Sequence, residues 1–352
     1  MKGLIPAAGL GTRLRPLTYT LPKPLLSVAN KPIIQYAIED LREAGIVDVG
    51  IIVSDFVRAA LEKEGLEVEG VSISYITQKE QLGIAHAVKQ AAEWLLGDDF
   101  CLYLSDNLFE EGIKSYVDAF RQPDTDAVIA LIQVPNPKEF GVAVLDGSGR
   151  VQKILEKPQN PPSNLAVAGV YCFKNKILDV IDSLSPSARG EYEITDAISG
   201  LMKIGNVRGI EVRGWWKDTG RHNDLLDANR LLLERIEPVS KGQVENSRLV
   251  GRVRIESGAV VKNSTIIGPA LIGAGAWLEN VYVGPFTSIG QSASLKGVEL
   301  EFSVIQDEAK LEDLPVRLQE CLIGRKASVR GNAKVPRVHR LVLSDTSVVE
   351  LG

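Results

Sequence analysis

Cysteine is scarce in this chain of 352 residues, and long apolar runs are missing. The three cysteines, Cys101, Cys172 and Cys321, are odd in number and far apart, and no two of them have metal-ligand spacing. This excludes a disulfide framework and favours a reducing compartment. No apolar run reaches the ~20 residues of a transmembrane helix, and the first residues lack the apolar stretch of a signal peptide. We expect a soluble, cytoplasmic protein that does not contact a membrane.

An excess of positive charge is also missing. The chain has 40 Lys and Arg against 45 Asp and Glu, which gives a net charge of −5 and a pI near 5.5. Binding to nucleic acid needs a basic surface, so we do not expect it. Hydrophobic residues make up 45% and charged residues 24% of the chain, as in ordinary folded proteins. The length predicts two domains.

The first two thirds of the chain alternate short apolar runs with amphipathic segments. The runs at 3–8 and 47–53 predict buried strands, and those at 71–77 and 100–104 predict further strands. The apolar spacing at 33–44 and 85–96 predicts helices. Alternating strands and helices are typical of an α/β domain with a mostly parallel sheet. Because ligands of such sheets bind at the carboxyl ends of strands, we expect the loops there to carry the chemistry.

The pattern changes near residue 249, where apolar residues begin to recur at steps of six, six and five positions. The series is Leu249, Ile255, Val261, Ile266, Ile272, Leu278, Val283, Ile289 and Leu295. Neither helix nor strand periodicity gives such a step, but the hexapeptide repeat of a parallel β-helix does, with the apolar side chains pointing inward. We therefore predict an α/β domain at 1–237 and a β-helix domain at 238–352. The last residues, 322–352, resemble strand material with less regular spacing, and their apolar residues between Val338 and Leu351 suggest that they pack onto the coil.

Candidate anion-binding residues follow the first predicted strand. Gly9 and Gly11 allow the backbone to turn tightly and to point N–H groups at phosphate oxygens. The loop lacks the ending of a P-loop and the third glycine of a dinucleotide fingerprint. Arg13 lies directly behind it, and Lys23 stands between two prolines that stiffen the chain. The alternatives are a surface ion pair for Arg13 and a solvated loop lysine for Lys23.

These segments together resemble the signature of the sugar-phosphate nucleotidylyltransferases. The matching motifs are Gly9-x-Gly11-Thr12-Arg13-x-x-Pro16, Lys23-Pro24, Ser105-Asp106-Asn107, Glu156-Lys157-Pro158 and the segments 189–196 and 215–220. The last two are similar to the thymidylyltransferase branch, in its long form with a C-terminal left-handed β-helix. The resemblance implies a Rossmann-like α/β fold. It also implies Mg²⁺-dependent transfer of a nucleotidyl group from dTTP to glucose 1-phosphate, for deoxysugar synthesis.

The resemblance implies a role for each motif residue. Arg13 and Lys23 would be catalytic, because two polyanions must be neutralised before they can react. The implied nucleotide-binding residues are Ala8, Gly9, Gly11, Thr12, Arg13, Gln78 and Gly83, and the implied sugar-phosphate-binding residues are Gly141, Glu156, Lys157, Val167 and Arg189. Asp106 and Asp218 would hold Mg²⁺, which prefers carboxylate oxygens. The alternatives are a turn residue for Asp106, an ion pair for Asp218, core packing for Val167 and a surface role for Arg189.

Several other functions stay open. UTP or another hexose 1-phosphate would be used by the same chemistry, because a single hydrogen bond decides base preference. A non-catalytic regulatory subunit should have lost Arg13, Lys23 or the paired aspartates. An acyltransferase in the coil would need a histidine base. The three histidines, at 86, 222 and 339, all lie outside 249–311, and we expect His86 to be structural. The open end of a β-helix predicts a homo-oligomer.

Overall fold

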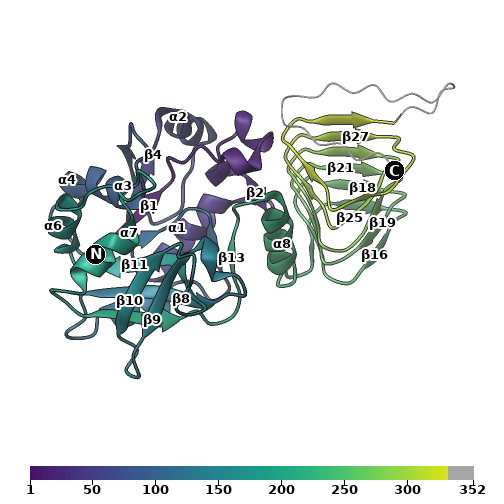
Figure 1. Cartoon of the computed structure of the whole chain (residues 1–352). Coiled ribbons are helices and arrows are strands. Elements are labelled where there is room, and N and C mark those ends of the chain that lie inside the picture. Colours follow the sequence, from purple (N-terminus) through teal and green to yellow (C-terminus); the bar gives the residue numbers. More distant parts are fainter. Residues whose placement is uncertain (332–352) are drawn as a thin grey trace. The chain divides into compact units, whose positions relative to one another are not determined.

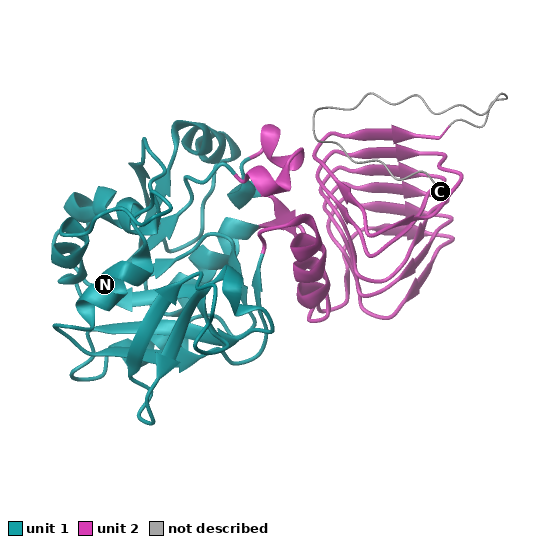
Figure 2. Ribbon diagram, viewed as in Figure 1, with its two compact units in different colours: residues 1–10, 22–25, 33–218 teal, residues 11–21, 26–32, 219–352 magenta. Residues whose placement is uncertain are grey.

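The computed structural model describes residues 1–331, which form two compact units (Figures 1 and 2). Unit 1 contains Met1–Leu10, Pro22–Leu25 and Ile33–Asp218, and unit 2 contains Gly11–Leu21, Leu26–Pro32 and the chain from Thr219 onward. The predicted domain boundary at 237/238 differs from this division into units and stays a prediction. The strand material expected at 322–352 is present within the described residues as β29 (Leu322–Ile323) and β30 (Ser328–Arg330), and its part between Val338 and Leu351 lies outside them. No helix in the described part is long and apolar enough to cross a lipid bilayer.

A nine-stranded mixed sheet forms the centre of unit 1. Its main path is β10-β9-β11-β6-β1-β4-β5, with β8 paired to β11 and β12 paired to β8. The strands are β1 (Lys2–Pro6), β4 (Asp48–Val53), β5 (Ser72–Thr77), β6 (Phe100–Tyr103), β8 (Ala127–Gln133), β9 (Gly141–Leu145), β10 (Val151–Glu156), β11 (Leu165–Phe173) and β12 (Val207–Glu211). The strands β6, β1, β4 and β5 are mutually parallel, and β11 pairs antiparallel with β6, β8 and β9. The predicted α/β class is confirmed.

Two predicted helical segments, 33–44 and 85–96, are helical in unit 1, which contains further helices that the sequence analysis did not predict. The helices of unit 1 are α1 (Ile33–Glu43), α2 (Asp55–Glu64), α3 (Ile84–Gln90), α4 (Ala92–Leu95), α5 (Lys114–Phe120), α6 (Ile177–Asp182) and α7 (Ile194–Leu201). In α1 the apolar stripe from Ile33 to Leu41 is buried, which is how an amphipathic helix is held on a sheet. The helix expected at 85–96 is divided at Ala91, where the N–H bonds to the Val88 carbonyl three residues back and tightens the turn.

Unit 2 is a triangular coil of parallel strands in three sheets. The first sheet contains β14 (Val239–Ser240), β17 (Val253–Ile255), β20 (Ala270–Ile272), β23 (Thr287–Ile289), β26 (Val304–Ile305) and β29 (Leu322–Ile323). The second contains β15 (Gln243–Glu245), β18 (Val260–Lys262), β21 (Trp277–Glu279), β24 (Ser294–Lys296), β27 (Lys310–Glu312) and β30 (Ser328–Arg330). The third contains β16 (Arg248–Val250), β19 (Thr265–Ile267), β22 (Tyr282–Val283), β25 (Glu299–Glu301) and β28 (Leu318–Gln319). The predicted β-helix is confirmed.

The coil repeats every 17 residues in its early turns, as the steps of six, six and five require. Val261, for example, is the register partner of Leu278, and the Asn246 and Asn263 side chains bond at a separation of 17 positions. From Ile255 to Leu295 every apolar residue of the predicted series is fully buried. Leu249 is the exception, at 37% exposed. It lies in the first coil, and among the described residues no earlier coil precedes it to cover this side chain.

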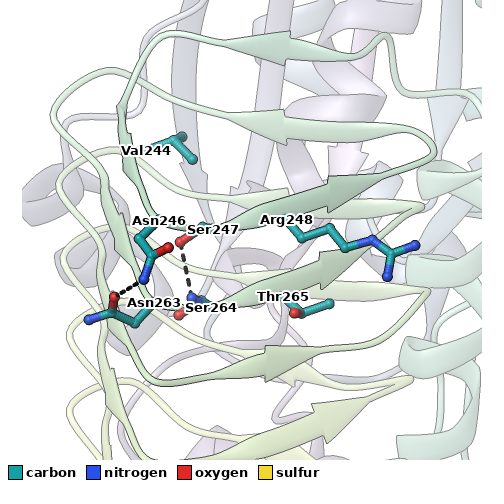
Figure 3. A pocket seen from close by; sticks show the side chains of 7 residues that line it. All are labelled: Val244, Asn246, Ser247, Arg248, Asn263, Ser264 and Thr265. Atoms are coloured by element: carbon teal, nitrogen blue, oxygen red, sulfur yellow. Dashed lines mark hydrogen bonds between the residues drawn. The ribbon is translucent and has the colours of Figure 1, made fainter.

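The corners of the coil are held by side chains that repeat from one turn to the next (Figure 3). Asn246 donates from Nδ2 to Oδ1 of Asn263 at 2.7 Å, and the Ser264 N–H donates to Oγ of Ser247 at 3.0 Å. Both asparagines have a positive φ, a conformation that asparagine tolerates better than most residues. Polar corner residues thus satisfy the backbone where the strands turn.

A helix and a short hairpin cover the first sheet of the coil within unit 2. The helix is α8 (His222–Leu233), and the hairpin joins β2 (Ser27–Val28) to β3 (Lys31–Pro32). Asn229 of α8 accepts from the Ala29 N–H at 2.9 Å and donates to the Phe286 carbonyl at 3.0 Å. The hairpin near the N-terminus is thus fixed by Asn229, which lies 200 positions further along the chain.

Candidate active site

Three predicted site residues lie at one edge of the parallel part of the sheet in unit 1. Gly9 follows β1, Gln78 follows β5 and Asp106 follows β6. Because β6, β1, β4 and β5 run in the same direction, the three loops leave the sheet at its carboxyl edge. This is the edge at which open α/β sheets bind ligands.

The shortest contact between predicted site residues joins Lys23 to Asp106. Lys23 lies in a 3₁₀ turn, Lys23–Leu25, in which Pro24 and Leu25 are buried. Its Nζ is 2.6 Å from Oδ2 of Asp106 and 4.0 Å from Oδ1 of Asp218. One ammonium thus faces both predicted metal-binding carboxylates, although the three residues are far apart in the sequence.

A two-stranded ribbon brings the two carboxylates together. It pairs β7 (Asn107–Phe109) antiparallel with β13 (Trp216–Asp218), so that Asp218 lies opposite Asn107. Burial raises the pKa of the Asp106 carboxyl, but the Lys23 ammonium and several hydrogen bonds outweigh burial and hold that pKa below its usual value. Asp106 is therefore kept as an anion next to a cation.

Asn107 and Trp216 orient Asp106, a role that the sequence analysis did not assign. The Trp216 indole N–H donates to Oδ1 of Asn107 at 2.7 Å, and Asn107 Nδ2 donates to Oδ1 of Asp106 at 2.7 Å. A Cβ at Gly169, whose φ is +74°, would stand 2.7 Å from Cγ of Asn107. Two sequence features could have revealed this orienting role: the Asn next to Asp106 in its motif, and the two tryptophans before Asp218.

The carboxylate pair fits a hard divalent cation that also binds phosphate. No cluster of three or more His, Cys, Asp or Glu side chains suited to a metal occurs in residues 1–331. Mg²⁺ rarely needs such a cluster, because it is commonly held by one or two carboxylates plus substrate phosphates and water. The Lys23 ammonium already shows that a positive charge is stable between these two side chains.

A second group of predicted residues meets around Gly141 in unit 1. Gly141 and Glu156 are register partners of β9 and β10. A Cβ at Gly141 would lie 2.9 Å from the Thr195 methyl, 3.3 Å from Oε2 of Glu156 and 3.3 Å from the Val167 side chain. Glycine is needed here because three side chains converge on the strand. Thr195, which the sequence analysis left without a role, also donates to Oε2 of Glu156 at 3.2 Å.

Glu156 is surrounded by two of the predicted cations. Lys157 Nζ lies 3.7 Å from its Oε1, and Arg189 Nη1 lies 3.5 Å from the same oxygen. Arg189 also pairs with Glu193, which is 6% exposed. Burial raises the pKa of Glu156 above its usual value, and the Lys157 ammonium offsets part of the rise. The arrangement offers hydroxyl acceptors and phosphate-binding cations in one place.

Gln78 and Gly83 lie near each other in unit 1, next to His86. Gln78 is 4% exposed, and its Nε2 is 2.9 Å from Nδ1 of His86. Gly83 has a φ of +102°, and a Cβ there would stand 2.6 Å from the Tyr192 carbonyl oxygen. The close approach that requires glycine at this position is therefore that of the Tyr192 backbone, a reason that the sequence did not reveal.

The remaining predicted nucleotide-binding residues divide between the units. Ala8 is buried and Gly9 is exposed in unit 1. Gly11, Thr12 and Arg13 belong to unit 2, where Gly11 takes a left-handed conformation in front of the 3₁₀ turn Thr12–Leu14. The Thr18 hydroxyl donates to the Gly11 carbonyl at 2.8 Å and fixes this turn. Arg13 is exposed.

Residues 2–235 match the profile of the family described as nucleotidyl transferase. The chain belongs to the nucleotidyl transferase family. The resemblance seen in the sequence is thereby confirmed. Nucleotidyltransferases of this family generally use a divalent metal, which agrees with the carboxylate pair described above.

Relatives of this nucleotidyltransferase match along its whole length. It is 46% identical over 360 residues to a low-salt glycan biosynthesis nucleotidyltransferase of Haloferax volcanii, with all of both chains covered. It is 44% identical over 355 residues to a glucose-1-phosphate thymidylyltransferase of Streptomyces griseus, again with all of both covered. A structure described as a thymidylyltransferase of Bacillus anthracis has a TM-score of 0.61 at 36% identity and covers 68% of this chain and 98% of that one. A UDP-glucose pyrophosphorylase with UDP-glucose has a TM-score of 0.61 at 26% identity, with 67% of this chain and 99% of that chain covered.

Proposed function

We propose that this enzyme transfers a thymidylyl group from dTTP to glucose 1-phosphate and releases pyrophosphate. The product, dTDP-glucose, would serve deoxysugar synthesis. The observation that supports this most is the Lys23 ammonium, 2.6 Å from Asp106 and 4.0 Å from Asp218. It lies in a chain that is 44% identical over its full length to a glucose-1-phosphate thymidylyltransferase.

The proposed reaction is a displacement at the α-phosphorus of the triphosphate. A phosphate oxygen of the sugar 1-phosphate forms a bond to the α-phosphorus. The bond from that phosphorus to the bridging oxygen breaks, and pyrophosphate leaves with the electron pair. Both reactants are polyanions, so the protein mainly has to position them and neutralise their charge.

Lys23 is proposed to neutralise charge at the α-phosphate, where its side chain is held by the 3₁₀ turn and the two carboxylates. Gly9, Gly11, Thr12 and Arg13 are proposed to bind the phosphates with backbone N–H groups and the guanidinium, and Ala8, which precedes Gly9 in the sequence, is proposed to contact the nucleotide. Asp106 and Asp218 are proposed to hold Mg²⁺, which when bound supplies charge neutralisation at phosphate oxygens.

The sugar 1-phosphate is proposed to bind at the second group of residues. Glu156 would accept hydrogen bonds from sugar hydroxyls, and Lys157 and Arg189 would bind the phosphate. Gly141 and Val167 would shape the wall on which the sugar lies, because their space is bounded by Glu156 and Thr195. Gln78 would contact the pyrimidine edge through its amide, and Gly83 would lie against the base.

Pyrophosphate release in the full-length protein tests the proposal. We expect turnover with dTTP, glucose 1-phosphate and Mg²⁺, and we expect chelation of the metal to abolish it. Asp218→Asn should lose metal-dependent turnover while the protein stays folded. Retained turnover in that variant would contradict the metal assignment. A folded wild-type protein without turnover on any triphosphate would instead favour the non-catalytic regulatory subunit.

UTP is the second candidate for the nucleotide. A solved structure with a TM-score of 0.61 to this chain is a UDP-glucose pyrophosphorylase bound to UDP-glucose. Thymine and uracil present the same hydrogen-bonding edge and differ in one methyl group, which is worth about 1–3 kcal/mol in a pocket. Measuring kcat/KM for dTTP and UTP with glucose, galactose and mannose 1-phosphates decides between them.

We also propose that the chain forms a homo-oligomer in the cytoplasm. Val244, Leu249 and Val250 of the first coil are 36–37% exposed, and within residues 1–331 the strands β15 and β16 each pair on one side only. A shallow pocket lined by Val244, Arg248 and Thr265 lies at the same end (Figure 3). A second copy that covers this end would bury the apolar residues and pair the strand edges. Light scattering tests this, and a monomer at micromolar concentration would contradict it.

A further inference from the structure

The amide of Gln78 has a fixed neighbour on one side. Its Nε2 lies 2.9 Å from Nδ1 of His86, and the Gln78 backbone N–H donates to the Val53 carbonyl at 2.8 Å, which anchors the residue at the end of β5. His86 belongs to α3, and its ring stacks on Tyr192 with centroids 6.1 Å apart and an interplanar angle of 28°. Both members of the Gln78–His86 pair are therefore held from outside the pair.

The second ring nitrogen of His86 faces another amide. Its Nε2 lies 3.3 Å from Nε2 of Gln90. A neutral imidazole has one donor and one acceptor, so the ring cannot accept a hydrogen bond from both Gln78 and Gln90. One of the two amides has to present its oxygen to the ring, and the choice decides which tautomer is present.

Burial decides which amide turns. Gln78 is 4% exposed, whereas Gln90 lies on the exposed side of α3. Turning an exposed amide leaves its other end in water and costs little, while turning a buried one changes every group packed around it. In the arrangement that satisfies the ring, Gln78 donates from Nε2 to Nδ1 of His86. His86 then donates from Nε2 to the side-chain oxygen of Gln90.

We propose that His86 is a positioning residue that sets the base preference of the enzyme by fixing the orientation of the Gln78 amide. The inference rests on the proposed function, because it takes Gln78 as the residue that contacts the base. With one N–H of Nε2 bound to His86, Gln78 offers the base its Oε1 as an acceptor and the second N–H as a donor.

A fixed amide accepts one class of pyrimidine and rejects the other. Thymine and uracil present the N3–H donor beside the O4 acceptor, which complements an amide held in this orientation. Cytosine presents the N3 acceptor beside the N4 amino donor, so acceptor would face acceptor and donor would face donor. Leaving these groups unpaired in a closed site is costly, which makes such discrimination strong. His86 thus excludes cytosine nucleotides and leaves the choice between dTTP and UTP to other contacts.

Replacing His86 tests the role in discrimination. His86→Phe keeps an aromatic ring against Tyr192 but removes the acceptor, so that the Gln78 amide is able to turn. We expect the ratio of kcat/KM for dTTP over dCTP to fall by about 10-fold or more, through gained use of dCTP. Lys89→Ala is the matched control, because Lys89 is exposed on the same helix and pairs with Asp182 at 2.9 Å. The ratio should not change in this control.

The tautomer of His86 gives a readout that does not depend on activity. The ¹⁵N resonances of the wild-type protein, labelled at its three histidines, should show His86 as the Nε2–H tautomer. The Nδ1–H tautomer or a doubly protonated ring would overturn the inference, because either requires Gln78 to present its oxygen to the ring. His222→Gln and His339→Gln assign the remaining signal by elimination if His86→Phe does not fold.

The outcomes separate this inference from the function on which it rests. Absence of turnover with every pyrimidine triphosphate would refute the proposed function, and with it the proposed contact between Gln78 and the base. Turnover with dTTP or UTP together with an unchanged dTTP to dCTP ratio in His86→Phe would leave the function intact and refute the role of His86. A lowered ratio together with the Nε2–H tautomer supports both.

Discussion

The two units of this nucleotidyltransferase handle charge in opposite ways. Unit 1 brings charged side chains inward, as with Lys23 beside Asp106 at 2.6 Å and Glu193 at 6% exposure. The coil of unit 2 fills its described interior with aliphatic side chains from Ile255 to Leu311 and keeps its charges outside. Burying charge costs folding free energy unless partners are placed accurately. The charged side chains of unit 1 are thus placed for the proposed chemistry, whereas the aliphatic interior of the coil stabilises unit 2 by repetition.

The outer face of the second sheet shows how the coil compensates its charges. The third residues of successive strands are register partners and alternate in sign: Glu245, Lys262, Glu279, Lys296, Glu312 and Arg330. Two of the neighbouring pairs form ion pairs: Lys262 with Glu245 at 3.1 Å, and Arg330 with Glu312 at 2.8 Å. These pairs are exposed to water and screened, so each one contributes little. Lys23 of unit 1, whose side chain is 14% exposed and faces two carboxylates, should respond very differently to mutation.

The largest expected effect is the loss of the Lys23 cation in unit 1. Lys23→Met keeps the length of the side chain and removes its charge, which leaves Asp106 and Asp218 without the ammonium between them. We expect kcat/KM for nucleotidyl transfer to fall by roughly 10³-fold, because a charge-stabilising donor is lost where charge develops. Steady-state pyrophosphate release with saturating Mg²⁺ measures the loss.

Lys262→Met is the matched control, since it removes the same charge from the outer face of the coil. Its kcat/KM should remain within about twofold of the wild type, as for a surface pair. Comparable losses in the two variants would contradict the contrast between the units.

The repeating coil was the part most accessible to prediction from sequence. Its period follows from the regular spacing of apolar residues along the chain, and the apolar residues of the predicted series from Ile255 to Leu295 are buried as predicted. The parallel strands of unit 1 were also predicted, because each is a short apolar run. Their antiparallel extension by β11 was not, since strand order depends on contacts between distant segments.

The sequence predicted which motifs form the site, but not how their residues meet. Sequence placed Lys23, Asp106 and Asp218 in the motifs, but their meeting required the β7–β13 pairing. Thr195 and His86 gained their positions from the packing of α7 and α3 against Glu156 and Gln78. No local pattern marks such residues, because their partners lie on other elements. The predicted functional roles themselves stay proposals until they are measured.

The next largest effect concerns stability in the interior of the coil. Leu278 is fully buried and Leu249 is 37% exposed, although both are inward positions of the same repeat. We expect Leu278→Ala to lower the free energy of unfolding by about 2–5 kcal/mol, because it removes buried methyl groups and leaves a cavity. Urea unfolding followed by the fluorescence of the neighbouring Trp277 reports the change. Leu249→Ala is the matched control and should lose clearly less at protein concentrations low enough for the chain to be monomeric. Equal losses would mean that the first coil is covered in solution, as the proposed oligomer requires.

A smaller effect is expected in the pH dependence of stability, which should differ between Glu156 and Asp106 of unit 1. The pKa of Glu156 is raised by burial, so its contribution to stability is present below its unfolded pKa and lost as the pH rises through the folded value. The free energy of unfolding of Glu156→Gln should therefore increase relative to that of the wild type from pH 4 to pH 7, so that the variant becomes relatively more stable.

Asp106→Asn should show the opposite trend. The pKa of Asp106 is lowered, since Lys23 and hydrogen bonds outweigh burial, so its contribution is present above the unfolded pKa and is lost as the pH falls through the folded value. The penalty of Asp106→Asn should thus shrink in acid. Urea titrations across this pH range test both, and slopes of the same sign would contradict the assignment of the two environments.

The smallest effect is expected on the outer face of the coil. Glu279 lies between Lys262 and Lys296 in the register of the second sheet, so Glu279→Lys would place three like charges on successive strands. Like charges directly opposite each other destabilise by about 0.2–1 kcal/mol per pair, so the melting temperature should fall slightly at low salt. About 1 M NaCl shortens the screening length to roughly 3 Å and should remove most of the difference. Glu279→Gln, which removes the attraction without adding repulsion, should lie between the two proteins. A salt-independent loss would mean that the side chain packs against its neighbours, and the contrast with unit 1 would then rest on the aliphatic interior alone.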